Sequence, residues 1–75
     1  MARENLKKAR QKAGLTQKEV AEYLGITIRS YQRIEDGQML GKIRNWDALE
    51  DLFKVHQRDL RMMISKKYTK EFRHH

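Results

Sequence analysis

The stretch QKEVAEYLGITIRSYQRIE, residues 17–35, decides the fold of this chain. Thr16 stands just before it, and Glu19 follows Thr16 three positions later. This is the spacing of a capping box, in which the hydroxyl accepts a hydrogen bond from a free helix amide and the carboxylate returns one to the capping residue. The pair therefore predicts a helix that begins near Gln17.

The apolar residues of this stretch recur every three or four positions. Val20, Ala21 and Leu24 would lie on one face of the first helix. Gly25 follows them, and a glycine at this place can adopt the left-handed conformation that ends a helix. Thr27 is then the cap of a second helix. The stretch predicts two short helices joined by a tight turn.

The second helix is predicted to run from about Ile28 to Asp36, with Gly37 as its end. Tyr31 and Ile34 take its inward positions. The outward side of its first turns carries Ile28, Arg29, Gln32 and Arg33.

Length and charge limit the kinds of protein that this chain can be. A domain of 75 residues has a small core, so we expect no enlarged catalytic cavity and no enzyme. Lys and Arg number 17 against 10 Asp and Glu, which gives a formal net charge of +7 and a pI of about 10.0. Such a charge attracts polyanions and favours a nucleic acid as the partner.

Several other classes are disfavoured by what the sequence lacks. It has no cysteine, which excludes disulfides and thiolate metal sites. His56 is far along the chain from His74 and His75, so we expect no metal site, and no motif predicts a cofactor. No apolar run approaches the ~20 residues that cross a bilayer, so we expect a soluble cytoplasmic protein without a membrane partner.

The remaining segments predict three further helices. The first covers residues 3–13 and stops at Gly14, with a shared face of Leu6, Ala9, Arg10 and Ala13. Residues 38–44 read as a loop, and Asn45 is predicted to cap a fourth helix. Its apolar stripe would be Trp46, Leu49, Leu52 and Phe53. A fifth helix is predicted to open near His56 or Gln57. Its inward residues would be Leu60, Met63 and Ile64.

The motif residues resemble the Cro and phage-repressor class of helix-turn-helix proteins, also called the XRE family, from about Leu6 to Leu60. The matching residues are Gly14-Leu15-Thr16-Gln17, Glu19-Val20-Ala21, Leu24-Gly25-Ile26-Thr27 and Arg33-Ile34-Glu35-Asp36-Gly37. The resemblance implies an all-α, compact five-helix lambda-repressor-like domain with the helix-turn-helix at helices 2 and 3. We expect this domain to span residues 1–65, followed by a basic tail or helix extension over residues 66–75.

The resemblance also implies a role for individual residues on double-stranded DNA. The second motif helix would enter the major groove, where Arg suits guanine and Gln suits adenine. Arg29 is the first choice for a base contact, with Gln32 beside it. Arg33 would reach a base or a phosphate. Ile28 would press on a thymine methyl group, or only on neighbouring apolar groups.

Phosphate contacts are expected around this helix. The resemblance assigns such a contact to Gln17, which would otherwise be a plain polar residue. Lys18, Lys42 and Arg44 are further candidates, or are simply solvated charges. The resemblance also pairs Arg10 with Glu35 in a largely buried ion pair that ties two helices together.

The C-terminal residues raise the question of a homodimer. Leu60, Ile64, Tyr68 and Phe72 recur every four residues, so a continued last helix would carry an apolar stripe suited to a dimer interface. The alternatives are that the two aromatic residues fold back on the core, or that the tail is disordered.

Two hypotheses of function follow. The first is a sequence-specific DNA-binding transcriptional regulator, a small repressor of phage or mobile-element type on a palindromic operator, in a bacterial or phage-encoded setting. The second is a protein-interaction module, an antitoxin or anti-repressor that binds a regulatory protein partner. Its exposed apolar residues would be Met39, Leu40, Ile43, Met62, Tyr68 and Phe72. A nonspecific architectural DNA binder is a third possibility and would show steep salt dependence without a preferred sequence.

Overall fold

The regular structure between residues 2 and 63, the part of the chain that the computed structural model describes, is entirely helical. The helices are α1 (Glu4–Lys12), α2 (Gln17–Leu24), α3 (Ile28–Asp36), α4 (Ile43–Phe53) and α5 (Gln57–Arg61). The prediction of an all-α domain with five helices is confirmed, and the two motif helices are α2 and α3.

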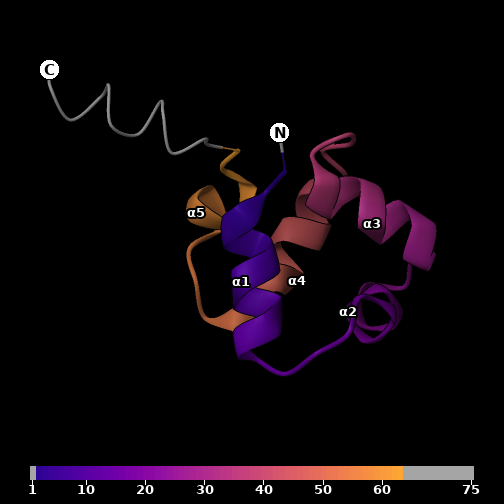
Figure 1. The fold of residues 1–75 in the computed structure, drawn as a ribbon, viewed down its shortest axis with the longest axis horizontal. Coiled ribbons are helices and arrows are strands. Elements are labelled where there is room, and N and C mark those ends of the chain that lie inside the picture. The colour runs from indigo at the N-terminus through magenta and orange to yellow at the C-terminus, as the bar shows by residue number, and fades with distance from the viewer. Residues whose placement is uncertain (1, 64–75) are drawn as a thin grey trace, which may run out of the picture.

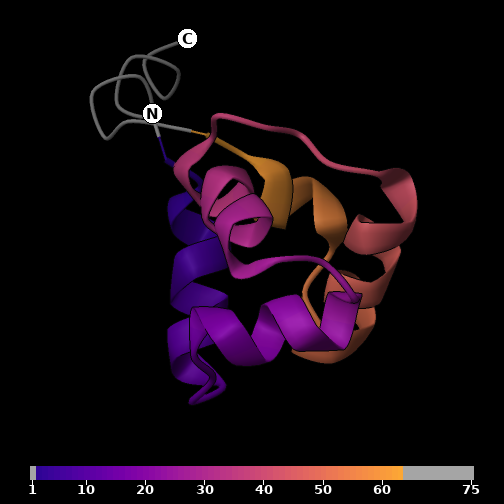
Figure 2. The same ribbon diagram turned by 90° about the vertical axis from the view of Figure 1, so that its right-hand side faces the viewer.

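The five helices pack so that α3 lies at one side of the domain and α5 at the other. Helix α5 packs against α1 and α4, whereas α2 packs against α3 and α4. Figure 1 shows α1 and α4 in the middle, between α5 and the α2–α3 pair. In Figure 2, α2 runs across the view while α3 is seen nearly along its axis, so these two helices cross at a steep angle.

All five helices contribute to one hydrophobic core. Its fully buried members are Leu6, Val20, Ala21, Tyr31, Ile34, Trp46, Leu49 and Leu60. The predicted inward positions on α2 and α3 are confirmed, except that Leu24 is only half-buried. Leu52 and Phe53 are also half-buried and pack against the core from the end of α4. Each large buried side chain contributes roughly 1.5–3 kcal/mol to folding, so the core fixes the orientation of α3.

The start of α2 is held by the capping box that the sequence predicts. The Glu19 amide donates to Thr16 Oγ1 at 3.1 Å, and the Thr16 amide donates to Glu19 Oε1 at 2.9 Å. Thr27 caps α3 by accepting a hydrogen bond from the Ser30 amide at 3.1 Å. Both motif helices therefore begin where local chemistry requires.

Two glycines end the motif helices in the left-handed conformation. Gly25 follows α2 with φ of 71°, and Gly37 follows α3 with φ of 83°. Side chains disfavour this region because the Cβ atom crowds the backbone. The tight turn between α2 and α3 therefore depends on Gly25.

The prediction that Asn45 caps the fourth helix is wrong. Helix α4 begins at Ile43, and Lys42 occupies the cap position without a side-chain hydrogen bond. Asn45 lies inside the first turn and is only 7% exposed. The physical reason is helical periodicity, because Asn45 stands one turn before buried Leu49 and so faces the same way.

Two other predicted inward positions are exposed. Ala13 caps the C-terminus of α1 and lies at the surface. Met63 is 39% exposed, because α5 ends at Arg61 and the backbone at Met62 is extended. Met63 therefore no longer follows the helical period that places Leu60 in the core.

Part of the predicted dimer interface cannot be compared with the structure. Ile64, Tyr68, Phe72 and the tail over residues 66–75, with His74 and His75, lie outside the described residues. In the part of the chain that is described, every helix is too short or too polar to cross a lipid bilayer.

Candidate nucleic-acid interface

The outer face of α3 presents four exposed side chains. They are Ile28, Arg29, Gln32 and Arg33, the residues selected from the sequence for base contacts. Positions three and four apart share a helix face, so these side chains form one surface over the first two turns. Tyr31, Ile34 and Glu35 face the core, whereas Ser30 is half-buried and Asp36 is exposed at the end of the helix.

The inner face of α3 is anchored by Glu35, which is 3% exposed. Arg10 holds its carboxylate with two hydrogen bonds, from Nε to Oε2 at 2.9 Å and from Nη2 to Oε1 at 3.1 Å. The Tyr31 hydroxyl donates to Oε2 at 2.7 Å, and Gln17 Nε2 donates to Oε1 at 3.2 Å. This network joins α1, α2 and α3 around one buried charge.

The same network sets the ionisation of its members. Burial acts to raise the pKa of Glu35, but the hydrogen bonds from Arg10, Tyr31 and Gln17 outweigh it and leave the pKa below its usual value. Burial, and then the hydrogen bond to Glu35, raises the pKa of the Tyr31 hydroxyl. The hydrogen bond to Glu35 raises the pKa of Arg10. Near neutral pH the pair is therefore ionised and the tyrosine is neutral.

Gln17 links this buried network to the exposed face of α3. It is the first residue of α2, its Nε2 donates to Glu35, and its Oε1 accepts a hydrogen bond from Gln32 Nε2 at 3.2 Å. The side-chain amide of Gln32 is thereby held in place by Gln17. The chain of contacts runs from the ion pair through Gln17 to a side chain at the surface.

The bridge leaves Gln32 with the groups that adenine requires. Only one N–H of its amide is used by Gln17, so a second N–H and the carbonyl oxygen stay free within the described contacts. Adenine presents N7 as an acceptor and N6 as a donor in the major groove, which match these two groups. The Gln17 contact therefore orients Gln32 and leaves one N–H and the carbonyl oxygen of its amide available.

The cations expected at phosphates lie around α3 on two other helices. Lys18 is exposed in the first turn of α2. Lys42 and Arg44 are exposed at the start of α4, and not in a preceding loop as expected for Arg44. The first amides of a helix carry partial positive charge, so the start of α4 adds to the attraction for a phosphate.

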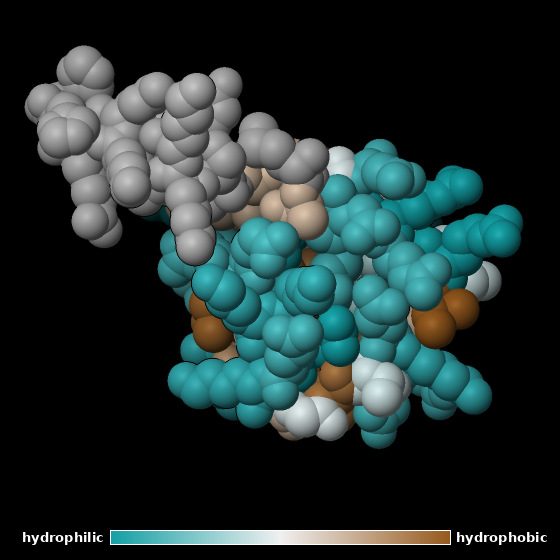
Figure 3. Space-filling model, in the orientation of Figure 1, coloured by the Kyte–Doolittle hydropathy of each residue, from teal (hydrophilic) through white to brown (hydrophobic). Residues whose placement is uncertain are grey.

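The surface around these helices is mostly hydrophilic. Figure 3 shows a face covered largely by hydrophilic side chains, with small and separate hydrophobic areas. A nucleic-acid interface is expected to be polar and positively charged, whereas a stable protein interface has a contiguous apolar centre. The visible face is polar and shows no contiguous apolar centre.

Three residues with structural roles at this site were not foreseen. Arg3 is buried and bonds to α3, Tyr31 adds a hydroxyl to the Glu35 network, and Asn45 lines a cavity beside α3. Tyr31 was identified only as a core residue, and its spacing of four from Glu35 could have indicated the hydrogen bond. No local signal marks Arg3, because its partners are distant in sequence. The spacing of four between Asn45 and Leu49 could have indicated that Asn45 faces inward.

Metal-binding residues do not gather in the described part of the chain. Within residues 2–63, no group of three or more His, Cys, Asp or Glu side chains has a geometry that could hold a metal ion.

Comparison with known families agrees with this geometry. A family model described as helix-turn-helix matches residues 6–60, which is most of the chain. The chain therefore belongs to the helix-turn-helix family of the Cro/C1 (XRE) type and is a DNA-binding regulatory domain. Searches of curated proteins and of solved structures found no match.

Proposed function

We propose that this protein is a sequence-specific transcriptional repressor of the phage or mobile-element type. Helix α3 enters the major groove of an operator, where Arg29 and Gln32 read bases. Ile28 and Arg33 complete the base-contacting surface. Gln17, Lys18, Lys42 and Arg44 contact the phosphates on either side.

The observation that carries this proposal is the two-sided character of α3. Its inner side is fixed by a core and by the Glu35 network, while its outer side presents four exposed residues with no acidic side chain among them. Side chains held on a rigid helix can discriminate between bases, because little conformational freedom is lost on binding. A nonspecific binder would not need the Gln17–Gln32 bridge.

Repression would follow from occupancy of a palindromic operator by two copies. Two recognition helices about one DNA turn apart, ~34 Å, would read two half-sites. In this proposal residues 1–65 form the DNA-binding domain, and residues 66–75 form a basic extension that follows it. Of the contacts predicted from the sequence, Leu60 is fully buried in the core of the domain. The proposed dimer contacts are therefore Ile64, Tyr68 and Phe72.

The test is selection of bound sequences from a random duplex pool at about 150 mM salt, where nonspecific phosphate binding is weakened. The selected DNA is then titrated against a scrambled duplex. We expect a palindromic consensus that binds at least ~10³-fold more tightly than the scrambled sequence. Arg29→Ala should lower the discrimination at its base by about 1–3 kcal/mol.

Arg58→Ala is the matched control, because Arg58 is an exposed arginine on α5, away from α3. It should leave the consensus and its affinity nearly unchanged. A pool without enrichment, together with weak and salt-sensitive binding to all duplexes, would rule out a sequence-specific repressor. A consensus that Arg29→Ala does not alter would instead remove Arg29 from base recognition.

A second candidate function is an antitoxin or anti-repressor that binds a protein. The observation that favours it is the exposure of Leu40 and Ile43, at 56% and 76%. Leu40→Ser with Ile43→Ser should then abolish binding of a regulatory protein while Arg29→Ala leaves that binding intact. Under the repressor hypothesis the same double variant keeps the operator preference that Arg29→Ala loses.

A further inference from the structure

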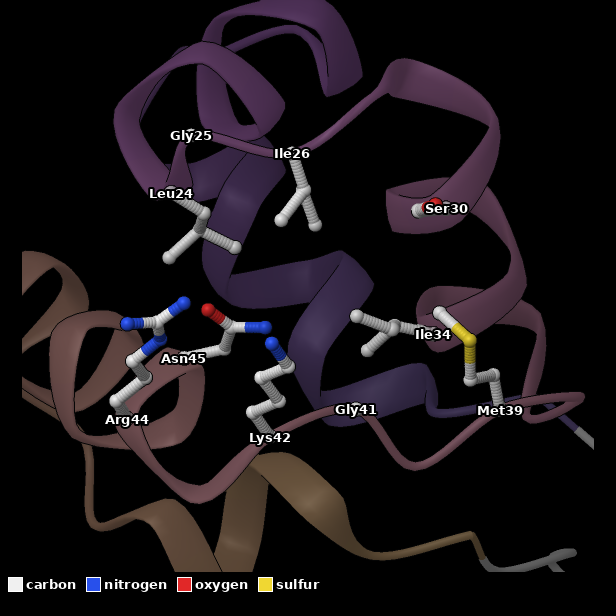
Figure 4. A pocket seen from close by; sticks show the side chains of 10 residues that line it. All are labelled: Leu24, Gly25, Ile26, Ser30, Ile34, Met39, Gly41, Lys42, Arg44 and Asn45. Carbon is white, nitrogen blue, oxygen red and sulfur yellow. The ribbon is translucent and has the colours of Figure 1, made fainter.

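A cavity of about 300 Å³ lies where the turn after α2, one flank of α3 and the start of α4 meet. Figure 4 shows the side chains that surround it. Its apolar wall is formed by Leu24, Ile26, Ile34 and Met39. Its polar wall is formed by Ser30, Lys42, Arg44 and Asn45. We call this space the α4 cavity.

Asn45 is the polar side chain that the α4 cavity buries. It is more than nine-tenths buried, and no hydrogen-bond partner of its amide is found among the described residues. Within residues 2–63, every side-chain nitrogen or oxygen atom that is fully shielded from solvent has a hydrogen-bond partner. The Asn45 amide has none, so it is not fully shielded and must border the open space of the cavity. Figure 4 shows the amide pointing into it. A buried amide costs free energy unless water or a ligand supplies its hydrogen bonds.

The charges around the α4 cavity are positive. Of the described residues that line it, Lys42 and Arg44 carry charge and none is acidic. Both are exposed at the rim, and in Figure 4 their charged ends lie on the same side of the cavity as the Asn45 amide. Two cations and an amide N–H together suit an anion with two oxygen atoms, because a guanidinium binds a carboxylate through paired hydrogen bonds.

We propose that the α4 cavity binds a small amphipathic carboxylate. Lys42, Arg44 and Asn45 hold the carboxylate, and the hydrocarbon body lies on the apolar wall. An inorganic anion would satisfy the polar groups but would leave that wall in contact with water. A carboxylate with an aliphatic or aromatic body satisfies both, as ligand sites do when a mostly apolar pocket carries a few convergent polar groups.

The ligand would regulate DNA binding, and this part of the inference rests on the proposed function. Lys42 and Arg44 are also the proposed phosphate contacts at the start of α4. A carboxylate bound between them neutralises the charge that the phosphate needs. We therefore expect a saturating carboxylate to weaken operator binding several-fold.

The test is an NMR titration of the full 75-residue chain with octanoate. Three control probes are titrated at the same ionic strength. Acetate has the carboxylate without the hydrocarbon chain, octanol has the hydrocarbon chain without the carboxylate, and inorganic phosphate is a different anion. We expect saturable shifts at Gly25, Gly41 and Asn45 with octanoate, with a Kd of roughly 1 mM or tighter. The other three probes should bind at least ~10-fold more weakly.

Asn45→Asp keeps the size of the side chain but replaces the amide with a second carboxylate. It should weaken octanoate binding by at least ~10-fold, whereas Gln38→Glu, the same exchange at an exposed site outside the cavity, should not. Circular dichroism checks that each variant is folded. If Asn45→Asp is unfolded, Lys42→Gln serves instead and should also weaken binding.

Three results would overturn the carboxylate site. They are the absence of saturable shifts, equal binding of octanol, and equal binding of acetate or phosphate. Regulation is tested separately by operator titration with and without octanoate. If octanoate binds and operator affinity is unchanged, the regulatory part is wrong. If the protein shows no operator preference even without octanoate, the proposed function fails, while the NMR result still decides the cavity.

Discussion

Glu35 shows how a single residue connects the core to the exposed face of α3. Its carboxylate accepts four hydrogen bonds, two from Arg10 and one each from Tyr31 and Gln17. These donors come from three helices, so the charge is compensated only when the helices are correctly packed. The resemblance implied the Arg10 contact, but the contributions of the hydroxyl and the amide are visible only in three dimensions.

Arg10→Met should destabilise the protein by about 3–5 kcal/mol, because Glu35 would remain buried without its cation. Urea unfolding monitored by circular dichroism measures the change. Lys8→Met, at an exposed position of the same helix, is the control and should change stability little. The double variant Arg10→Met with Glu35→Met should recover part of the loss. A double variant as unstable as the sum of both single variants would contradict the pairing.

The depressed pKa of Glu35 predicts a stability loss in acid. In the unfolded chain Glu35 has the ordinary glutamate pKa of about 4.3, which is above its pKa in the folded state. At pH values between these two pKa values, the unfolded state therefore binds more protons than the folded state. The contribution of Glu35 is therefore present above pH ~4.3 and is lost as the pH falls through the folded-state pKa. The difference in unfolding free energy between wild type and Glu35→Gln should shrink towards pH 3. A difference that stays constant from pH 7 to pH 3 would show that Glu35 is not the group responsible.

At the scale of elements, the helix ends differ in how well their residues suit the conformation. Gly25 ends α2 with φ of 71°, and Lys54 ends α4 with φ of 58°. Glycine has no penalty in this region, whereas a side chain costs roughly 1–2 kcal/mol. Helix α2 therefore ends without strain and α4 ends with it. This difference between the two helices predicts opposite effects of two substitutions.

Gly25→Ala should destabilise the protein by about 1 kcal/mol because of local backbone strain, although no more distant part of the molecule lies within 4 Å of the added methyl group. Lys54→Gly should stabilise it by roughly 0.5–1 kcal/mol, since the relief of strain exceeds the extra entropy of the unfolded chain. Thermal unfolding of both variants beside the wild type measures these shifts. Shifts in the same direction for both would mean that backbone strain at these caps does not control stability.

At the scale of the whole molecule, Arg3 joins segments that are far apart in the chain. Its Nε donates to the Arg61 carbonyl at 3.0 Å, and its Nη1 donates to the carbonyls of Ile34 and, at 2.9 Å, Met39. Its guanidinium also stacks 5.3 Å from the centre of the Trp46 ring. Burial, and then repulsion from Arg61, lowers the pKa of Arg3. The ends of α3 and α5 are thus held by one N-terminal side chain.

Arg3→Lys keeps the charge but cannot reproduce three donors in one plane. Hydrogen bonds from a charged group contribute about 1.5–3 kcal/mol each, so loss of even one should lower stability by at least ~1.5 kcal/mol. Hydrogen exchange should show faster opening at the C-terminal ends of α3 and α5, with the middle of α2 little affected. Uniform acceleration across all helices would instead indicate a general loss of the core.

The sequence alone determined the features that arise from neighbours within about four residues. The capping box at Thr16 and Glu19, the cap at Thr27 and the left-handed glycine at residue 25 each require only local contacts. The outward face of α3 follows from the same short-range periodicity. For these reasons the boundaries of α2 and α3 and the four exposed residues could be predicted without knowing how the helices pack.

Only the tertiary structure decided the features that depend on which surfaces meet. Asn45 has the sequence context of a helix cap, but the packing of α4 directs its side chain towards the α4 cavity. Arg3 donates hydrogen bonds to residues more than thirty positions away. Met63 leaves the core because α5 stops at Arg61. Such outcomes depend on which surfaces the packed molecule brings together, and the distant hydrogen-bond partners of Arg3 leave no periodic trace in the chain.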